Sequence, residues 1–267
     1  MTGFEAFLLG LLQGLTEFLP VSSSGHLLIA KEFFGIETQD ATFEIVVHAA
    51  TVLSTIVVFR KSLWNMVSDS VRFRRTPYSQ LALRILVSMI PVLVVGLFFK
   101  DKVEALFSGG ITFVGFMLIL TSLLLILAQW MTTRRSDKAH PIGYRDAFVI
   151  GIAQACAVVP GLSRSGATIA TGLCMGNYKD KVAPFSFMMV LVPVLGEAFL
   201  EILDGGFSPA VSGLSLTSLL IGFTTAFFAG LFACRFMIAI VRRVKFTWFA
   251  LYCLLAGAAC LIVPLFK

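Results

Sequence analysis

The chain has 267 residues, of which 58% are hydrophobic and only 13% are charged. Soluble domains carry about 25% charged residues, so this composition excludes an ordinary soluble protein and indicates several membrane-spanning helices. The formal net charge is +6. The basic residues gather in short loops between apolar runs, and this distribution argues against nucleic acid as a partner.

The first apolar segment, residues 4–35, is a poor spanning helix because Pro20 and a run of serines interrupt its middle. Backbone polar groups exposed at such a break cannot face lipid and must be buried in protein or line a wet cavity. We therefore predict a re-entrant helix–loop–helix hairpin that enters and leaves the membrane on one side. Residues 144–176 are interrupted in the same way at Pro160 and predict a second hairpin.

Six other segments are apolar enough to cross a bilayer, which takes about 20 residues each. They are residues 42–60, 82–100, 111–131, 184–203, 214–238 and 247–266. The predicted fold class is an all-α polytopic membrane protein in a single membrane domain, with six transmembrane helices and two re-entrant hairpins.

The two interrupted segments are copies of one another: Gly10 aligns with Gly151, an offset of 141 positions. We predict an inverted-topology repeat, with repeat one at about residues 1–133 and repeat two at about 142–267. Each copy holds one hairpin, which does not cross the membrane, and three spans, which do. Because three is an odd number of crossings, the second copy begins on the opposite side and is inverted. The tips of the two hairpins would then meet near the middle of the membrane.

Lysine and arginine residues favour cytoplasmic loops, which fixes the predicted orientation. Four basic loops fall on one side of the predicted topology: Arg72, Arg74 and Arg75; Arg134, Arg135 and Lys138; Lys179 and Lys181; Arg242 and Arg243. We predict a multi-pass protein of the bacterial inner (plasma) membrane, with both termini extracytoplasmic.

Arg164 lies in the second break, where an arginine in mid-membrane costs about 2.5–3.5 kcal/mol on translocon scales and so is normally paired or faces a wet path. Ser163 and Ser165 flank it. Hydroxyls, N–H groups at a helix start and a guanidinium together form an anion receptor. The alternative is a structural salt bridge with Glu17 or Glu197.

In the first break, Gln13 and Glu17 are four residues apart and share a helical face. Three consecutive serines beginning at Ser22, and then His26, follow Pro20. We expect Ser22 or Ser24 to cap the second half-helix. A carboxylate, a hydroxyl and an imidazole opposite an arginine suit nucleophilic or acid–base chemistry on an anionic substrate. The carboxylate, with phosphate oxygens and water, would also hold a divalent cation such as Mg²⁺ or Ca²⁺.

Other ionisable residues leave two interpretations open. Glu44 and His48, one turn apart near the outer end of the first span, are either a helix-start carboxylate with a polar neighbour or residues at the mouth of the site. Glu197 lies within a predicted span, where an unpaired charge is expensive, so it would line the cavity or a homodimer contact.

The segments Gln13–His26 and Pro160–Thr168 resemble the two signature motifs of the undecaprenyl-diphosphate phosphatase, or bacitracin-resistance, family, and the similarity covers essentially the whole chain. The resemblance implies a membrane phosphatase whose partner is a polyprenyl diphosphate lipid. Its activity would be hydrolysis of the C55 isoprenyl diphosphate to the monophosphate at the outer face of the inner membrane. This reaction recycles the lipid carrier of cell-wall synthesis.

The resemblance also assigns roles by position. Glu17 matches the second acidic residue of the first motif, Ser23 and His26 match its functional hydroxyl and imidazole, and Arg164 matches the diphosphate-binding loop. The remaining positions assigned to substrate binding are Gln13, Ser22, Ser24, Ser163, Ser165, Gly166 and Thr168. The family admits Glu or Gln at position 13; glutamine here leaves one carboxylate and makes Glu17 the expected metal ligand.

The resulting hypothesis is that Ser23 attacks the terminal phosphorus, with His26 or Glu17 as the base and a divalent cation at Glu17. His26 as the nucleophile, with Ser23 only orienting, is the rival mechanism. A transporter or flippase for an anionic lipid is the alternative function, because inverted repeats are common in transporters. An intramembrane serine protease built on Ser23 and His26 would leave Arg164 without a purpose.

Overall fold

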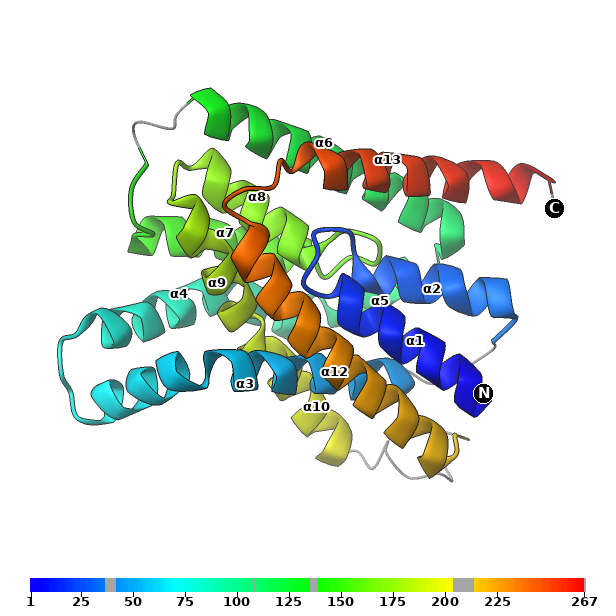
Figure 1. Ribbon diagram of the computed structural model, residues 1–267, viewed down its shortest axis with the longest axis horizontal. Helices are drawn as coiled ribbons and strands as arrows, with labels where there is room; N and C mark the ends of the chain where they lie inside the picture. Colours follow the sequence, from blue (N-terminus) through cyan, green and yellow to red (C-terminus); the bar gives the residue numbers. More distant parts are fainter. Residues whose placement is uncertain (37–41, 108, 135–138, 204–213, 267) are drawn as a thin grey trace.

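The computed structural model describes residues 1–36, 42–107, 109–134, 139–203 and 214–266. Its described residues form helices and turns, with one isolated β-bridge between His140 and Asn177 and no strand (Figure 1). The all-helical fold class is therefore confirmed. Arg135 and Lys138 of the second basic loop lie outside the described residues.

Both interrupted segments fold as two half-helices joined by a turn. The first consists of α1 (Gly3–Thr16) and α2 (Ser23–Phe34), and the second of α7 (Tyr144–Cys156) and α8 (Arg164–Cys174). Pro20 and Pro160 lie in the turns, where a residue without an N–H group cannot continue a helix. We refer to these two turns as the tips of the hairpins.

Among the described residues, four helices are long and apolar enough to cross a membrane. They are α3 (Thr42–Val71), α4 (Pro77–Phe98), α6 (Gly110–Arg134) and α12 (Leu216–Ile240). Each contains most or all of one predicted span, although α3 continues to Val71 instead of ending near residue 60. These four helices are those of an integral membrane protein.

The span predicted at 184–203 is not a single helix, because α9 (Lys179–Met189) ends before α10 (Leu191–Leu203) begins. Pro193 explains the division: its ring would clash with the carbonyl of Met189, four residues earlier, and it has no N–H group to donate. The final predicted span is α13 (Thr247–Ile262) with a 3₁₀ turn at Val263–Phe266. A short helix, α5 (Lys100–Phe107), was not predicted. The count of six spans plus two hairpins therefore stays a prediction.

The two halves of the chain pack into each other. The half-helix α1 lies against α12 of the second half, and α7 lies against α4 of the first half. The repeated glycines allow this close approach: a Cβ on Gly10 would come within 2.5 Å of the Gly222 carbonyl oxygen, and one on Gly151 would overlap the Ser88 carbonyl. The helices α6 and α13 also run side by side (Figure 1). The packing is reciprocal, as an inverted repeat would require, while the repeat boundaries stay a prediction.

The first tip is anchored in the main apolar core. Phe18 follows Glu17 directly, is buried, and meets the ring of Phe187 on α9 edge-on, with ring centroids 5.2 Å apart. Burying an aromatic side chain contributes about 1.5–3 kcal/mol. This contact fixes the backbone from which the Glu17 carboxylate projects.

A polar clamp joins the two ends of the second hairpin. The backbone N–H of His140 donates to the Gly176 carbonyl, and the N–H of Tyr178 donates to the His140 carbonyl, both at 3.0 Å. The His140 ring hydrogen-bonds the carbonyls of Pro141 at 3.0 Å and Met175 at 3.1 Å. These two bonds, with the Asp146 carboxylate 3.6 Å away, raise the pKa of His140.

We expect this clamp to make stability depend on pH. Because the folded pKa of His140 is raised, its stabilisation is complete below the unfolded imidazole pKa of about 6.5 and is lost as pH rises through the folded pKa. The ring is about half exposed, so solvent screening limits the effect to less than about 1 kcal/mol. Thermal unfolding of wild type and His140→Gln between pH 5.5 and 9 tests this. The two melting temperatures should converge at high pH, and parallel curves would contradict the assignment.

Candidate active site

The two hairpin tips contact each other. The Ser165 hydroxyl donates to the carbonyl of Leu19 at 3.0 Å, and a Cβ on Gly25 would lie 3.2 Å from the Cα of Gly161. The half-helices α2 and α8 both begin at this contact. The first N–H groups of a helix have no partner within it, and the helix dipole adds positive potential there. Two helix starts therefore face one region, which favours an anion.

One serine caps each of these helix starts. Ser22 Oγ accepts from the Gly25 N–H at 3.3 Å, and Ser163 Oγ accepts from the Gly166 N–H at 3.0 Å. The prediction that Ser22 or Ser24 caps α2 is confirmed for Ser22. The next residues, Ser23 and Arg164, are the first residues of the two helices, and their side chains take no part in capping.

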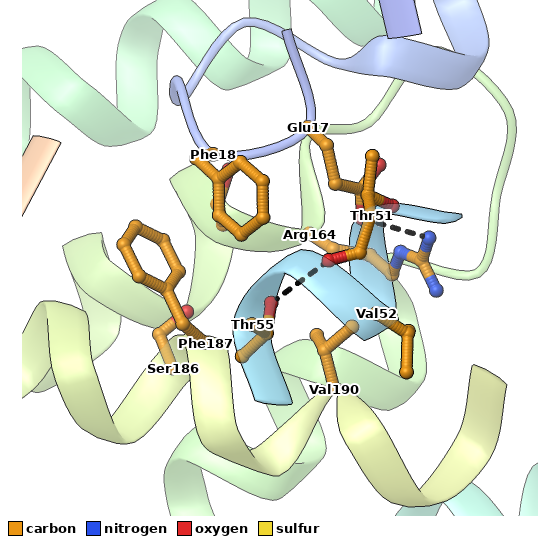
Figure 2. Close-up of a pocket in the computed structure, with 10 residues that line it drawn as sticks. Glu17, Phe18, Thr51, Val52, Thr55, Arg164, Ser186, Phe187 and Val190 are labelled. Carbon is orange, nitrogen blue, oxygen red and sulfur yellow. Dashed lines mark hydrogen bonds and ion pairs between the residues drawn. The ribbon is translucent and has the colours of Figure 1, made fainter. Parts of the chain in front are cut away.

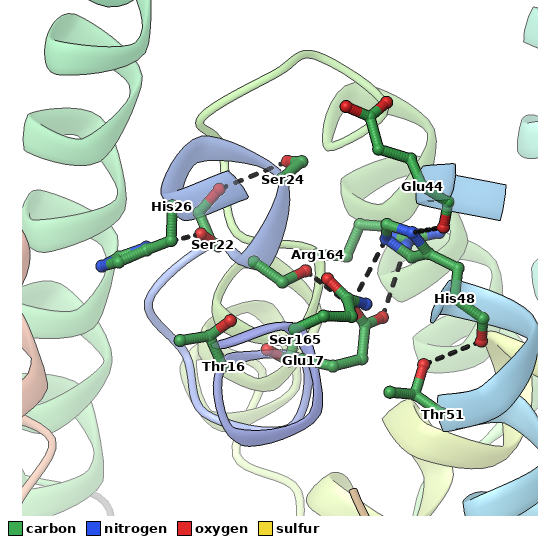
Figure 3. A network of polar contacts seen from close by, with 12 residues as sticks. Thr16, Glu17, Ser22, Ser24, His26, Glu44, His48, Thr51, Arg164 and Ser165 are labelled. Carbon is green, nitrogen blue, oxygen red and sulfur yellow. Dashed lines mark hydrogen bonds and ion pairs between the residues drawn. The ribbon is translucent and has the colours of Figure 1, made fainter. Parts of the chain in front are cut away.

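Glu17 is the centre of the polar contacts (Figure 3). Its Oε2 accepts from Ser23 Oγ at 2.5 Å and from Gln13 Nε2 at 2.9 Å. Its Oε1 accepts from Arg164 Nη2 at 3.3 Å. The carboxylate is 9% exposed, and Gln13 is fully buried. The serine hydroxyl is thus hydrogen-bonded to a buried base and lies beside a guanidinium.

Arg164 retains hydrogen-bonding capacity beyond this ion pair. Its side chain is 24% exposed, and within the described part of the chain its guanidinium donates one hydrogen bond, to Glu17. A guanidinium has five N–H donors in a planar fork. The two interpretations of Arg164 are therefore compatible: it pairs with Glu17 and still offers donors to an anion. The side chain of Glu197, the other proposed partner, lies outside the described part of the structure.

Two pockets adjoin the Glu17–Arg164 pair. The first is walled by hydroxyls from both tips, and its lining consists of Glu17, Ser22, Ser23, Ser24, Leu162, Ser163, Arg164 and Ser165. The second lies toward α3 and α9 and mixes hydroxyls with apolar side chains (Figure 2). Its lining adds Phe18, Thr51, Val52, Thr55, Ser186, Phe187 and Val190 to Glu17, Arg164 and Ser165. The hydroxyl-walled pocket suits phosphate oxygens, and we call it the polar pocket.

Comparison with known proteins identifies the family. Residues 6–259 match the family described as "Bacitracin resistance protein BacA". The chain belongs to the BacA family. The undecaprenyl-diphosphatase of Bacteroides thetaiotaomicron is 48% identical, with the alignment covering 99% of this chain and all of that protein. The proteins of that name from Christiangramia forsetii, covering 97% of each chain, and Carboxydothermus hydrogenoformans, covering 98% of each, are 45% and 36% identical.

Four residues that the BacA resemblance assigns to the site line neither pocket: Gln13, His26, Gly166 and Thr168. His26 turns away from Glu17 and toward α13, where its Nε2 lies 2.6 Å from the Tyr252 hydroxyl (Figure 3). The backbone N–H of Gly166 donates to the Ser163 hydroxyl that caps α8. Thr168 is fully buried, and its hydroxyl contacts Ser186 Oγ on α9 at 2.6 Å. These two bonds hold α8 in place, and they leave Gly166 and Thr168 without an exposed group for substrate.

The imidazole that does face the site is His48. Its Nε2 lies 3.6 Å from Glu17 Oε2, and its Nδ1 hydrogen-bonds the Glu44 carbonyl at 2.7 Å. That carbonyl only accepts, so Nδ1 carries the proton and Nε2 is directed at the carboxylate. The Glu44 side chain instead pairs with Lys31 at 2.5 Å. The two residues of this pair therefore differ: His48 lies beside the site, whereas the Glu44 side chain is engaged by Lys31 and does not contact Glu17.

The same residues provide a test for a divalent cation. No cluster of three or more His, Cys, Asp and Glu side chains occurs among the described residues, and Arg164 already balances the charge of Glu17. The amide oxygen of buried Gln13, however, has no hydrogen-bond partner in the described structure. The amide presents its Nε2 to Glu17, and a half-turn of the amide would put this oxygen beside the carboxylate as an oxygen-only donor pair, the kind that Mg²⁺ and Ca²⁺ prefer. The residues fit a cation that arrives with the phosphate oxygens of a ligand.

Proposed function

We propose that this BacA-family protein hydrolyses undecaprenyl diphosphate to undecaprenyl phosphate and inorganic phosphate. One observation carries the proposal: the Ser23 hydroxyl, 2.5 Å from the buried Glu17 carboxylate, shares the polar pocket with the Arg164 guanidinium. A nucleophile held on a base and facing an anion receptor suits phosphoryl transfer. The undecaprenyl-diphosphatase names of full-length relatives support the same substrate. They do not favour the transporter alternative.

In the first step, Ser23 Oγ attacks the terminal phosphorus of the diphosphate. The bond from this phosphorus to the bridging oxygen breaks, and undecaprenyl phosphate leaves with the electron pair on that oxygen. Glu17 accepts the hydroxyl proton. Arg164 donates to the non-bridging oxygens, where charge is concentrated in phosphoryl transfer. Hydroxyls and helix N–H groups of both tips add further donors.

In the second step, water attacks the phosphoserine, restores the Ser23 hydroxyl and releases inorganic phosphate. The carboxyl group of Glu17 holds the proton taken in the first step and returns it to the serine oxygen. His48 Nε2 lies 3.6 Å from Glu17 Oε2, and in this scheme it accepts a proton from the incoming water. The roles proposed for His26 in the sequence-based mechanism pass to Glu17 and His48.

A divalent cation, Mg²⁺ or Ca²⁺, is proposed to bind at Glu17 and Gln13 together with the diphosphate. Arg164 and Glu17 sum to zero charge, whereas the diphosphate brings at least two negative charges into a site with a low dielectric constant. When bound, such a cation neutralises phosphate oxygens as a Lewis acid.

The proposed location is the bacterial inner membrane, with the polar pocket open to the periplasmic or extracellular side and both termini extracytoplasmic. The predicted asymmetry of the basic loops supports this orientation. The substrate lipid would reach the pocket from the outer leaflet.

The direct test is phosphate release from C15 and C55 prenyl diphosphates by detergent-solubilised protein. A phosphatase releases phosphate without a membrane to cross, and we expect EDTA to stop the release and Mg²⁺ or Ca²⁺ to restore it. A carrier would release none under these conditions. Activity that persists in EDTA would contradict the cation proposal and leave the phosphatase proposal intact.

A further inference from the structure

Both ring nitrogens of His26 are hydrogen-bonded, one to the backbone of Ser22 and the other to Tyr252 on α13. Nδ1 is 2.7 Å from the Ser22 carbonyl, and Nε2 is 2.6 Å from the Tyr252 hydroxyl. The carbonyl only accepts, so Nδ1 carries the proton; Nε2 of the neutral ring then accepts from the tyrosine. The rings of His26 and Tyr252 also stack, with centroids 5.5 Å apart and planes 10° from parallel. A ring bound at both ends has no free nitrogen for the substrate.

The residue that His26 holds is strained. Ser22 has φ of +71°, a left-handed conformation that residues other than glycine adopt at a cost of about 1–3 kcal/mol. Its carbonyl accepts both the His26 ring N–H and the His26 backbone N–H, the latter at 3.2 Å. Such a conformation persists only where surrounding contacts fix it. Ser22 directly precedes Ser23, so its backbone angles set the direction of the proposed nucleophile.

Tyr252 belongs to α13, in the other half of the chain. This helix meets the first tip at a second point, because the thiol of buried Cys253 donates to the Pro20 carbonyl at 3.6 Å. Two consecutive residues of α13 therefore contact the first hairpin, Tyr252 at the His26 ring on α2 and Cys253 at the Pro20 carbonyl in the tip. The hydroxyl of Tyr252 is the outer end of a chain that runs through His26 and Ser22 to Ser23.

We propose that Tyr252 is a positioning residue, which acts through His26 to hold the strained Ser22 carbonyl and so aims Ser23 at phosphorus. This inference rests on the proposed phosphatase function. It assigns His26 a structural link in the site in place of a base or a nucleophile. It also assigns a function to a half-exposed tyrosine that neither signature motif contains.

The test is a double-mutant cycle with Tyr252→Phe and His26→Ala, measured by phosphate release from farnesyl diphosphate. Tyr252→Phe removes only the hydroxyl, and we expect kcat to fall about 10-fold, the size of one lost hydrogen bond, with KM unchanged. In the His26→Ala background the same change should have an effect below about 2-fold, because the link is already broken. Trp248→Phe, one turn away on α13 and 70% exposed, is the matched control and should match wild type.

Three outcomes would overturn the inference. If Tyr252→Phe leaves kcat unchanged or raises it, the hydrogen bond from Tyr252 to the His26 ring is not needed to position Ser23. If its effect is equally large with and without His26, Tyr252 does not act through the ring. If KM rises and kcat does not fall, the hydroxyl contacts substrate.

A measurement independent of activity separates this inference from the proposed function. The chain has three histidines, so histidine-selective ¹⁵N NMR in detergent resolves each ring. We expect His26 as the neutral tautomer protonated on Nδ1, with an Nε2 shift that moves in Tyr252→Phe. An unchanged Nε2 shift would refute the positioning chain even if the wild-type protein released no phosphate at all.

Discussion

Replacing Arg164 with methionine is expected to lower kcat/KM for prenyl diphosphate hydrolysis by about 10³-fold or more, the range seen when a transition-state arginine is removed. The side chain supplies planar paired donors to the phosphate oxygens and compensates the charge of Glu17. Arg164→Lys keeps the charge and loses the fork, so an intermediate fall of about 10²-fold is expected. Steady-state phosphate release measures both.

The control for Arg164 is Arg235→Lys, an exposed arginine on α12 that lines neither pocket. It should turn over like wild type. Because Arg164→Met leaves the buried Glu17 unpaired, its melting temperature must be measured beside its activity, and Glu17→Gln with Arg164→Met restores the charge balance. Near-normal turnover in a folded Arg164→Met protein would end the anion-receptor account.

Ser23→Ala is expected to lower kcat by about 10³-fold or more, as the loss of a nucleophile does in other hydrolases, with a smaller change in substrate affinity. The alanine cannot form the phosphoserine, while Arg164 and the tip hydroxyls still bind the diphosphate. Rapid quenching of the wild-type reaction followed by mass spectrometry should find phosphate on the peptide that contains Ser23.

Ser122→Ala is the matched control for Ser23→Ala. Ser122 is a buried serine of α6 whose hydroxyl has no hydrogen-bond partner among the described residues. Its loss should leave turnover intact. Phosphate found on His26 in place of Ser23, or near-normal turnover of Ser23→Ala, would support the rival mechanism in which the imidazole attacks.

Sequence patterns were enough to predict the features that depend on local chemistry. Proline and glycine interruptions predicted the two hairpins, and the cost of Arg164 in a membrane predicted a partner or a wet cavity, which the structure provides as Glu17 and the polar pocket. The division between α9 and α10 was missed, although Pro193 was there to indicate it. Residues 184–203 are apolar and long enough to span a membrane, so they were predicted as one helix although Pro193 interrupts it.

The orientation of the two imidazoles could not be predicted in the same way. His26 follows Ser23 by three residues and was expected to point with it, but a tyrosine 226 positions away draws its ring to α13. His48 reaches Glu17 from α3, an element that neither motif contains. Both results depend on packing between distant helices, and no spacing within a motif encodes them.

The most direct test of the central claim is an experimental structure with a non-hydrolysable prenyl methylene-diphosphonate bound. The account predicts that the terminal phosphonate lies within hydrogen-bonding distance, about 3 Å, of both Ser23 Oγ from the first half and the Arg164 guanidinium from the second. A diphosphonate held by one half alone, or outside the polar pocket, would contradict it.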